Sequence, residues 1–428
     1  TDARQRSAQF GHSSLADETP RHAGSFLTMK PRKILHLDLD AFFCSVEELN
    51  DPSLIGTPFA VGGSPTGRGV ITSASYAARQ FGVRSAMPSG RALSLCPQIK
   101  LVRGSYHLYG EYSDKVMAIL DDVSPLVEKV SVDEAFIDVT DLPQPLEHIA
   151  SLLQHRIKEE TKLPCSIGGG TNKLVAKVAN DFGKSSVRTG LAPQKITIIP
   201  PGQEAVFFAP LDIQAIWGVG PKTAQRLKSR GIQTVGQLAN LTEKELTFLF
   251  GKFGPSMKTR ALGISHSPVS HGGQVKSISN ETTFSRDISD DAELKNRLRG
   301  LCDKVGYRLR KANLAGKVVQ IKVRAPDFST ITRQAEVATP TQLGEEVYEM
   351  AAKLLDEHWQ KNSPVRLIGV GVSTLSEPHR QLALWDDESH KREELAQAVD
   401  SLKDKYGKNI ILRASNLKNA KKSSWRED

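Results

Sequence analysis

The chain of 428 residues is too long for one ordinary hydrophobic core, because domains usually hold about 100 to 200 residues, so we expect several domains. Hydrophobic residues make up 39% and charged residues 25%, and no uninterrupted apolar run is long enough to span a bilayer. Lys and Arg total 57 against 48 Asp and Glu, and this net charge of +9 suits a polyanionic partner without proving one. Four widely separated cysteines without a CxxC pair argue against a disulfide framework or a zinc site, so we expect a cytoplasmic protein with reduced thiols.

The first half of the chain alternates strand-like and helix-like segments. Residues 1–29 show no periodicity and no signal-like apolar core, so we expect a disordered extension. After it, "KILHLDLDAFF" predicts a strand, residues 109–123 a helix with one apolar face, and "PLVEKVSVDEAFIDV" two strands joined at a bend over residues 131–134. A helix near residues 146–160, a strand in "PCSIGGG" and a helix in "NKLVAKVANDF" follow. This order predicts an α/β or α+β layer.

The second half changes character near residue 192. Short helices punctuated by "GVG" and "RGI" occupy residues 192–262, and a polar connector follows at 263–275. A last mixed domain at 276–378 contains two strands on either side of a helix over 343–358. The tail contains one amphipathic helix that Gly407 can end, and docking on the same chain and binding of a partner are both open for it. Its apolar residues share one face: Leu395, Ala398, Val399, Leu402 and Tyr406.

Two acidic pairs carry the strongest chemical signal. Alternate residues of a strand share a face, so Asp38 and Asp40 point to the same side as His36. Asp133 and Glu134 lie at the predicted bend, where the two-residue period fails and both side chains can aim at one point. If this hairpin packs beside the first strand, three carboxylates converge, and their mutual repulsion calls for cations between them. Hard oxygen ligands select Mg²⁺ or Mn²⁺, and two such ions roughly 3.5 to 4 Å apart can stabilise the attacking and leaving oxygens of a phosphoryl displacement.

Residue types alone leave another interpretation open, in which Asp38 and Asp40 end a strand and "SVDE" forms a solvated turn. Five motifs in order argue for the metal interpretation: "HLDLDAFFCSVEE", "GVITSASYAARQFGVRSAMP", "VSVDEAFIDVTD", "TNKLVAKVANDFGK" and "IWGVGPKTAQRLKSRGI". Together they resemble the Y-family translesion DNA polymerases, most closely the bacterial DNA polymerase IV branch. The resemblance extends from about Lys30 to Leu384.

The resemblance implies a multidomain α/β (α+β) fold in the form of a right-handed polymerase with an additional little-finger domain. It implies a template-directed DNA polymerase that adds deoxynucleotides to a primer 3′ end, with low-fidelity translesion synthesis in DNA repair and damage tolerance. The corresponding segments are the first part of the palm at 30–45, the fingers at 46–104, the second part of the palm at 105–191, a helical thumb at 192–262, a linker at 263–275, the little finger at 276–378 and a tail at 379–428.

The same resemblance assigns the metal site. Asp38, Asp133 and Glu134 match the catalytic metal ligands, and the main-chain carbonyl of Leu39 matches a further ligand. The implied cofactors are two Mg²⁺ ions, with Mn²⁺ as a substitute.

The nucleotide site is assigned in the same way. Phe43 matches the steric gate, an aromatic ring under the sugar of the incoming nucleotide that would collide with a ribose 2′-hydroxyl, whereas Phe42 is expected to pack in the core. Tyr76 and Arg79, three residues apart on one helix, match triphosphate contacts, and Ser73 precedes them.

Three lysines recur along "NKLVAKVANDFGK" at helical spacing. Lys184 matches the family's triphosphate lysine, whereas Lys173 and Lys177 are compatible with an ordinary solvated face. The sequence departs from the family pattern at Ala41, which is small, in the extra glycine of "SIGGGTNK", and in "GKSSVRTG", which lacks the usual proline.

Several features indicate DNA as the partner. The segment "IWGVGPKTAQRL" looks like a helix-hairpin-helix, whose glycines expose N–H groups at a helix N-terminus that suits a DNA phosphate, although such hairpins also occur as structural turns. Basic residues of the last domain face little acidic competition along the sequence and predict salt-sensitive duplex binding. The DNA-binding candidates are Gly218, Gly220, Lys222, Arg297, Arg299, Arg308, Arg310, Lys322 and Arg324.

The peptide "QLALW" resembles the bacterial sliding-clamp-binding motif, with Gln381, Leu382, Leu384 and Trp385 as its contacts. The expected partners are primer-template DNA, deoxynucleoside triphosphates and a sliding clamp, with a monomeric enzyme and no membrane. A non-catalytic DNA- and clamp-binding scaffold is one rival, against which the intact Asp38, Asp133 and Glu134 argue. A template-independent transferase or nucleotide cyclase is another, against which the helix-hairpin-helix and the basic last domain argue.

Overall fold

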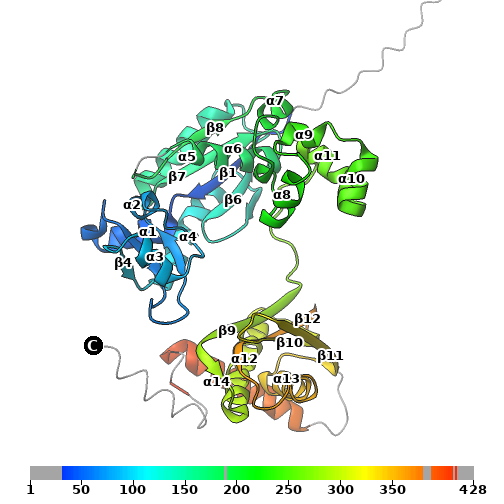
Figure 1. Ribbon diagram of the computed structural model, residues 1–428. Coiled ribbons are helices and arrows are strands. Elements are labelled where there is room, and N and C mark those ends of the chain that lie inside the picture. The colour runs from blue at the N-terminus through cyan, green and yellow to red at the C-terminus, as the bar shows by residue number, and fades with distance from the viewer. Residues whose placement is uncertain (1–30, 188–189, 379–386, 408–409, 412–428) are drawn as a thin grey trace, which may run out of the picture.

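The computed structural model describes residues 31–187, 190–378, 387–407 and 410–411 (Figure 1). The expected extension over residues 1–29 and the clamp-like peptide at Gln381, Leu382, Leu384 and Trp385 lie outside these described ranges. Within them, the strands form three sheets, and no helix combines the length and the apolar character needed to cross a bilayer.

A five-stranded sheet lies at the centre of the first part of the chain. Its order is β5-β6-β1-β7-β8, and β1 is antiparallel to both of its neighbours. The strands are β1 Ile34–Leu39, β5 Val127–Lys129, β6 Glu134–Asp138, β7 Cys165–Gly170 and β8 Ile196–Ile198. The predicted hairpin with its bend before Glu134 is therefore confirmed. Strand β8 lies after residue 191, where the second part of the palm was expected to end, and pairs in parallel with β7 before the helical segment begins.

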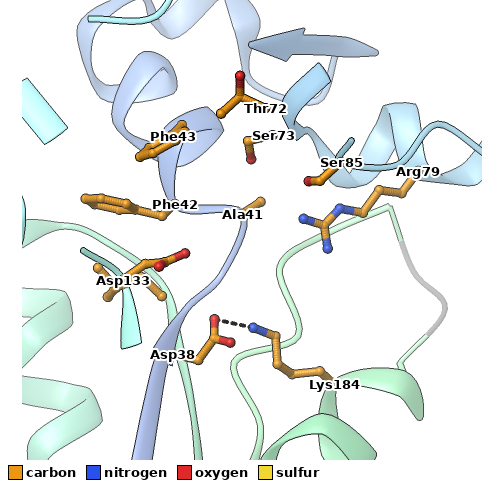
Figure 2. A pocket seen from close by; sticks show the side chains of 11 residues that line it. Asp38, Ala41, Phe42, Phe43, Thr72, Ser73, Arg79, Ser85, Asp133 and Lys184 are labelled. Carbon is orange, nitrogen blue, oxygen red and sulfur yellow. Dashed lines mark hydrogen bonds and ion pairs between the residues drawn. The ribbon is translucent and has the colours of Figure 1, made fainter. Parts of the chain in front are cut away.

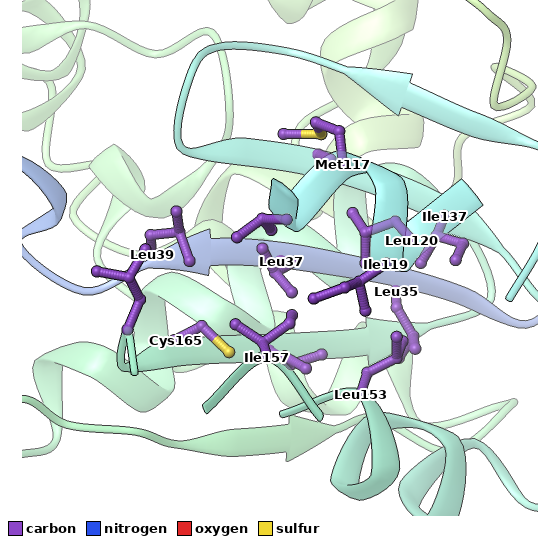
Figure 3. Close-up of a cluster of buried hydrophobic side chains, with 14 of the residues drawn as sticks. Leu35, Leu37, Leu39, Met117, Ile119, Leu120, Ile137, Leu153, Ile157 and Cys165 are labelled. Atoms are coloured by element: carbon purple, nitrogen blue, oxygen red, sulfur yellow. The ribbon is translucent and has the colours of Figure 1, made fainter. Parts of the chain in front are cut away.

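Alternate side chains of β1 point to opposite faces of this sheet, and helices cover both faces. Leu35, Leu37 and Leu39 enter a buried apolar core, shown in Figure 3, beneath α4 Tyr106–Asp121 and α5 Leu146–Thr161. The opposite face is covered by α6 Lys173–Ser185, which contacts β7 and β1. Because both faces are covered, the polar side chains of β1 are held among protein groups rather than in water.

Glycine in β7 allows α6 to approach the sheet closely. A Cβ atom on Gly168 would lie 2.0 Å from the carbonyl oxygen of Ala176 and 2.4 Å from the nitrogen of Asn180, closer than any real contact. The glycine-rich departure from the family pattern therefore has a packing reason. It lets the helix that carries Lys184 lie against the strand next to β1.

The segment between β1 and α4 forms a small separate layer. A turn at Ala41, in the left-handed region with φ of 46°, connects β1 to α1 Phe42–Asn50. A three-stranded sheet in the order β3-β2-β4 follows, with two helices against it. Its elements are β2 Phe59–Gly62, β3 Ile71–Ala74, α2 Tyr76–Gln80, α3 Ser89–Leu95 and β4 Lys100–Val102.

Short helices form the next segment, as the glycine punctuation predicts. They are α7 Glu204–Phe208, α8 Pro221–Lys228, α9 Val235–Ala239, α10 Glu243–Phe250 and α11 Gly254–Ala261. Their core includes Leu174, Val175 and Val178 from α6, so this helical segment packs directly on the helix behind the five-stranded sheet.

The last domain is a four-stranded antiparallel sheet in the order β11-β10-β12-β9 with two helices over one face. Its elements are β9 Ser277–Ile288, α12 Asp291–Lys311, β10 Ala315–Arg324, β11 Thr330–Thr341, α13 Gly344–His358 and β12 Val365–Ser376. The predicted helix over residues 343–358 and its flanking strands are confirmed. Helix α12, which begins at the N-cap Asp290, lies on β9 and β12 and contributes the longest row of buried residues in this core.

The connector between these parts is attached to the five-stranded sheet. Arg32 donates hydrogen bonds to the carbonyl oxygens of Ser265 and Ser267, and Val269 is buried beside Ile34 and Phe136. The connector therefore runs along the edge of the first part of the molecule before it reaches β9.

The predicted tail helix is confirmed as α14 Asp387–Tyr406, and Gly407 follows it with φ of 97°. It docks on the last domain through Arg310 of α12, whose guanidinium donates to both carboxylate oxygens of Asp400 at 2.7 and 3.1 Å. Docking on the same chain, one of the two open possibilities, is thus observed. The apolar face is not the docking face, since Leu395 and Tyr406 remain 65% and 60% exposed.

Candidate active site

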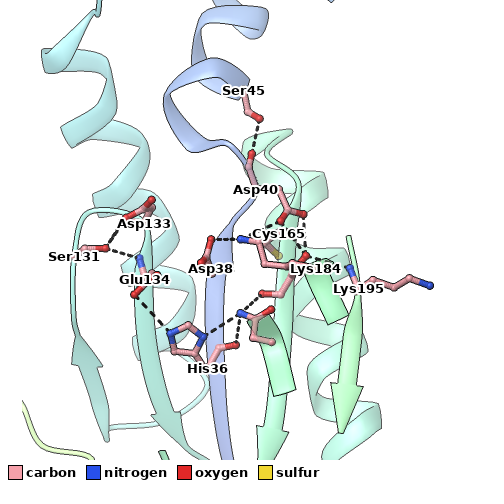
Figure 4. Close-up of polar contacts among 12 residues, drawn as sticks. His36, Asp38, Asp40, Ser45, Ser131, Asp133, Glu134, Cys165, Lys184 and Lys195 are labelled. Carbon is pink, nitrogen blue, oxygen red and sulfur yellow. Dashed lines mark hydrogen bonds and ion pairs between the residues drawn. The ribbon is translucent and has the colours of Figure 1, made fainter. Parts of the chain in front are cut away.

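The register of β1 and β6 brings the two acidic segments together. Asp38 is directly paired with Glu134 across the strands, and the backbone N–H of Leu39 donates to the carbonyl oxygen of Asp133 at 2.9 Å (Figure 4). The register therefore brings the two acidic segments side by side, with Asp38 and Asp133 lining one cavity.

Asp38 is the most deeply placed of these three carboxylates and pairs with Lys184. The Lys184 Nζ atom lies 2.5 Å from Asp38 Oδ1. The pKa of Asp38 is raised to about 7: burial is the largest cause, the Lys184 ammonium opposes it, and the nearby Glu134 and Asp133 carboxylates add to the rise. The site thus favours additional positive charge beside Asp38.

Glu134 faces the covered side of the sheet. Its Oε2 lies 3.8 Å from Nε2 of the fully buried His36 and 3.3 Å from Nζ of Lys177. The Asn180 amide donates to His36 Nδ1, so Nε2 carries the imidazole proton that faces Glu134. The neighbouring His36 imidazole lowers the pKa of Glu134 to about 2, while burial lowers the pKa of His36. Glu134 is therefore held as a carboxylate.

Asp133 lies at the bend before β6 and lines a cavity of about 210 Å³ at the end of β1 (Figure 2). The Ser131 hydroxyl donates to Asp133 Oδ1 at 2.5 Å and fixes the carboxylate within the turn. The cavity is lined by Asp38, Leu39, Ala41, Phe42, Phe43, Thr72, Ser73, Arg79, Ser85, Asp133 and Lys184. Thr72 and Ser85 were not singled out from the sequence.

Asp40 shares the side of β1 with Asp38, as predicted, but its surroundings differ. It is fully buried and accepts hydrogen bonds from the Ser166 hydroxyl and from the backbone N–H of Gln194. Its Oδ1 also lies 3.4 Å from Lys184 Nζ. Asp40 therefore contacts Ser166, Gln194 and Lys184 and does not line the cavity.

The donor set of the site suits a hard divalent cation. Asp38, Asp133 and Leu39 all line the cavity, and carboxylate and carbonyl oxygens are the ligands that Mg²⁺ and Mn²⁺ prefer. Among the described residues, no three acidic, His or Cys side chains already surround a common point. Instead, the Lys184 ammonium lies beside Asp38 and partly neutralises its charge. The oxygen donors of Asp38, Asp133 and Leu39 and the negative charge of the two carboxylates therefore suit the implied cation.

The proposed nucleotide contacts gather on the other wall. Ser75 caps α2, and the Arg79 guanidinium lies 4.5 Å from the centre of the Tyr76 ring while its Nε donates to the Ala74 carbonyl. The Tyr76 hydroxyl is buried and has no hydrogen-bond partner among the residues that the structure describes, and burial raises its pKa to about 12. Ser73 and Arg79 line the cavity with Lys184, so these predicted residues are brought together.

The two phenylalanines after β1 have different environments. Phe42 is only 3% exposed within the core of the five-stranded sheet, as expected. Phe43 is half-buried at the cavity and stacks on Tyr109 of α4, with ring centres 4.2 Å apart and planes at 14°. The ring of Phe43 is thus placed between the cavity and a buried tyrosine.

Two of the three lysines along α6 are not on a solvated face. Lys173 is 8% exposed and its Nζ lies 2.7 Å from Glu128, and Lys177 pairs with Glu134. The solvated-face interpretation is therefore wrong. Its physical reason is that β5 and β6, more than forty residues earlier, present carboxylates to the helix.

The predicted helix-hairpin-helix forms at the start of α8. Gly218 has φ of 100°, Gly220 is the N-cap, and Pro221 begins the helix. Lys222 is exposed at this end. The Arg260 guanidinium donates to the carbonyl oxygen of Trp217 and holds the turn against α11. The backbone N–H groups at this helix start are thus presented at the surface.

The basic residues of the last domain have more acidic partners than the sequence suggested. Arg297 and Arg310 pair with Glu293 and Asp400, and Lys322 pairs with Glu281 of a neighbouring strand. The expectation of little acidic competition is therefore wrong, because these acids come from other turns, strands and the tail. Of the other candidates, Arg299 pairs with Glu345, Arg308 donates to the Ser279 carbonyl, and Arg324 donates to the Thr330 hydroxyl.

These basic residues lie on two sides of the domain. Lys322 and Arg324 alternate with the buried Ile321 and Val323, so they lie on the sheet face away from the helices. Arg297, Arg299, Arg308 and Arg310 belong instead to α12.

Comparisons with known proteins agree with this arrangement. Residues 37–181 match the impB/mucB/samB family, residues 201–232 match the helix-hairpin-helix motif of that family, and residues 275–384 match its C-terminal domain. The chain is 40% identical over 383 residues to DNA polymerase IV of Dehalococcoides mccartyi strain CBDB1, covering 89% of this chain and 96% of that protein. It is 40% identical over 364 residues to DNA polymerase IV of Alkalilimnicola ehrlichii, covering 83% of this chain and all of that protein.

A solved structure supports the fold. A Y-family DNA polymerase chimera superposes with a TM-score of 0.72 at 24% identity and covers 81% of this chain and all of the chimera. The palm, fingers, thumb and little-finger organisation expected from the sequence is therefore the observed one.

Proposed function

This chain belongs to the impB/mucB/samB family of Y-family DNA polymerases, and from that premise we propose that Asp38, Asp133 and Glu134 hold the divalent cations of nucleotidyl transfer. The protein is a DNA-directed DNA polymerase suited to translesion synthesis, with DNA and nucleotides as its substrates. Its cofactors are two Mg²⁺ ions, for which Mn²⁺ can substitute. When bound, they neutralise the growing charge and stabilise the attacking and leaving oxygens.

The pairing of Asp38 with Glu134 beside Asp133 carries this proposal. The acidic residues come from segments almost one hundred residues apart in sequence and meet at one end of β1. Asp38 is buried with a raised pKa, so proton and metal compete for the same oxygens. The carbonyl of Leu39 lines the same cavity and supplies a further oxygen.

The opposite wall is proposed to bind the triphosphate. Lys184 and Arg79 supply fixed positive charge to its oxygens, and the unpartnered Tyr76 hydroxyl and the Ser73 hydroxyl supply donors. Lys184 then exchanges its contact with Asp38 for a phosphate oxygen. The triphosphate is thereby oriented with its reacting phosphorus toward the acidic residues.

Phe43 is proposed as the steric gate. Its ring lies at the cavity and is supported from behind by the stacked Tyr109 ring. A ribose 2′-hydroxyl above Phe43 would overlap the ring, whereas a deoxyribose would not, so deoxynucleotides are preferred.

DNA is proposed to contact two surfaces. The N–H groups at the start of α8, with Gly218, Gly220 and Lys222, suit a backbone phosphate. On the little finger, Lys322 and Arg324 on the open sheet face are the best placed of the basic residues. The basic residues of α12, Arg297, Arg299, Arg308 and Arg310, are bound to protein groups and would contribute less.

Two further proposals concern partners. The peptide at Gln381, Leu382, Leu384 and Trp385 is proposed to bind a sliding clamp, and the enzyme is proposed to act as a cytoplasmic monomer. In the sequence the peptide stands between β12 and α14, which both lie on the little finger.

Primer extension tests the proposal. The purified chain should extend a primer on intact and lesion-bearing templates with Mg²⁺ and should stop when EDTA removes it. Asp133→Ala should abolish extension and leave DNA binding unchanged, because it removes a metal ligand and no DNA contact. Asp114→Asn, at a carboxylate whose side chain is 81% exposed, is the control and should retain full extension. DNA binding without any extension by the wild-type chain would instead identify a scaffold.

A further inference from the structure

A buried carboxylate behind the proposed gate has no role in the function described so far. Glu47 lies on α1, one turn after Phe43, and is only 3% exposed. Its Oε1 accepts a hydrogen bond from the Tyr109 hydroxyl at 2.5 Å and another from the backbone N–H of Ser105 at 2.9 Å. Hydrogen bonds to a charged acceptor are the stronger ones, so Glu47 fixes the position of this tyrosine.

Tyr109 connects Glu47 to the gate. Its ring is 2% exposed and stacks nearly parallel on Phe43, which is the closest aromatic pair of this region. The other rings near Phe43 are farther away, with Phe42 at 5.5 Å and the exposed Tyr106 at 6.1 Å. Movement of Phe43 away from the cavity therefore requires movement of the Tyr109 ring.

The Tyr109 hydroxyl is also confined on its remaining side. A Cβ atom at Gly104 would lie 3.1 Å from the Tyr109 oxygen and 3.0 Å from a methyl group of Val61. The backbone of Gly104 thus approaches the hydroxyl as closely as packing permits. The tyrosine has little space in which to rotate while its hydroxyl donates a hydrogen bond to Glu47.

We propose that Glu47 is a positioning residue for sugar discrimination, acting through Tyr109 on Phe43. The inference rests on the proposed function of Phe43 as the gate. A steric gate works by repulsion, so it discriminates only as far as the ring resists displacement by a 2′-hydroxyl. The hydrogen bond from Tyr109 to Glu47 raises the free energy needed to displace the Tyr109 ring. The Phe43 ring, which stacks on Tyr109, therefore resists displacement by a 2′-hydroxyl more strongly.

The test compares deoxyribonucleotide and ribonucleotide insertion. Steady-state kcat/KM is measured for dCTP and for CTP opposite the same template dG, with Mg²⁺, for wild type, Glu47→Gln and Tyr109→Phe. Glu47→Gln keeps the shape but removes the charge, and Tyr109→Phe keeps the ring but removes the donor. Each should lower the dCTP to CTP ratio roughly tenfold, the size of one hydrogen bond to a charged group, by increasing CTP insertion while dCTP insertion stays within about threefold of wild type.

A double variant and a control identify the cause. Glu47→Gln combined with Tyr109→Phe should change the ratio no more than the larger single effect, because both remove the same interaction. Tyr112→Phe makes the same chemical change one turn away on α4 and should leave the ratio unchanged. If Glu47→Gln does not fold, Tyr109→Phe alone decides the matter.

Two results would overturn the inference. One is an unchanged ratio in folded Tyr109→Phe, and the other is an equal loss of dCTP and CTP insertion, which indicates a merely structural role. Phe43→Ala in the same assay separates this inference from the proposed gate. If Phe43→Ala raises CTP insertion and Glu47→Gln does not, only the role of Glu47 fails; if Phe43→Ala has no effect, the gate assignment itself fails.

Discussion

The ammonium group of Lys184 lies 2.5 Å from Oδ1 of Asp38 and 3.4 Å from Oδ1 of Asp40. It comes from the last turn of α6, while both carboxylates come from β1 and the turn after it. Asp40 is fully buried and has other donors, whereas Asp38 faces the cavity. When Asp38 binds a cation, the Lys184 ammonium contacts a phosphate oxygen instead of Asp38. Asp40 therefore keeps Lys184 in place during this exchange.

Replacement of this ammonium gives the first prediction. Lys184→Met should raise the KM for the incoming nucleotide and lower kcat/KM roughly 10- to 100-fold, the effect of one charge-assisted hydrogen bond. Steady-state insertion kinetics measure it. Lys195→Met, at an exposed lysine on the neighbouring segment, is the control and should behave as wild type. An unchanged KM in Lys184→Met would exclude a triphosphate contact.

The raised pKa of Asp38 predicts a specific pH dependence of stability without metal. The folded-state pKa of about 7 exceeds the ordinary value of 3.8, so between these values the folded state binds the extra proton. Stability from this group is therefore lost as pH rises toward 7, by at most about 1.4 kcal/mol per pH unit. Asp38→Asn should remove this loss, so its melting temperature relative to wild type should increase between pH 5 and 7.

Comparing wild type with Asp38→Asn isolates the contribution of the Asp38 carboxyl group to the pH dependence of stability. The lowered pKa of His36 acts in the opposite direction in the same window but is common to both, and the lowered pKa of Glu134 acts only below pH 5. Thermal unfolding in EDTA supplies the measurement. Added Mg²⁺ should stabilise wild type more than Asp38→Asn, because only the carboxylate binds the cation well. A melting difference that does not vary with pH would contradict the assigned pKa.

Local patterns in the sequence predicted how the acidic residues are placed on β1 and at the bend before β6. The alternation of β1 fixed which residues share a face with Asp38, and the bend before Glu134 followed from the hairpin pattern. The order of motifs then identified the family. These features depend on residues that are neighbours in sequence, so sequence periodicity captures them.

Contacts between distant segments could not be predicted in this way. The Lys173 partner Glu128 and the Lys322 partner Glu281 lie on other strands, so the lysines looked solvated or free. The burial of Asp40 depends on Ser166 and Gln194, which are far away in the chain. The strand β8 was missed for a related reason: three residues carry too short a pattern, and only pairing with β7 defines them.

The close approach at Gly168 predicts a strongly unfavourable substitution. Gly168→Ala would place a Cβ atom 2.0 Å from the Ala176 carbonyl oxygen and force α6 away from the sheet. We expect a loss of about 1–3 kcal/mol or more in the free energy of unfolding, together with reduced insertion, because Lys184 moves with the helix. Urea unfolding measures the first effect. Gly110→Ala is the matched control: no atom lies within 4 Å and the position is helical, so stability should rise by about 0.5–1 kcal/mol.

The docking of α14 gives the last prediction. Arg310 and Asp400 form a bidentate pair with side chains only 12% and 17% exposed, and the Tyr307 hydroxyl donates to Asp404 one turn later. Leu395 and Tyr406 of α14 are 65% and 60% exposed, so these polar contacts contribute to the attachment of the helix to the little finger. Asp400→Ala should therefore increase hydrogen exchange throughout α14 about tenfold while exchange in α12 stays unchanged, because α12 remains in its own core. Ser401→Ala, whose hydroxyl donates within the helix to the Gln397 carbonyl, should keep the wild-type exchange rate, since it touches no docking contact. Unaltered exchange in Asp400→Ala would mean that other contacts hold the tail helix on the little finger.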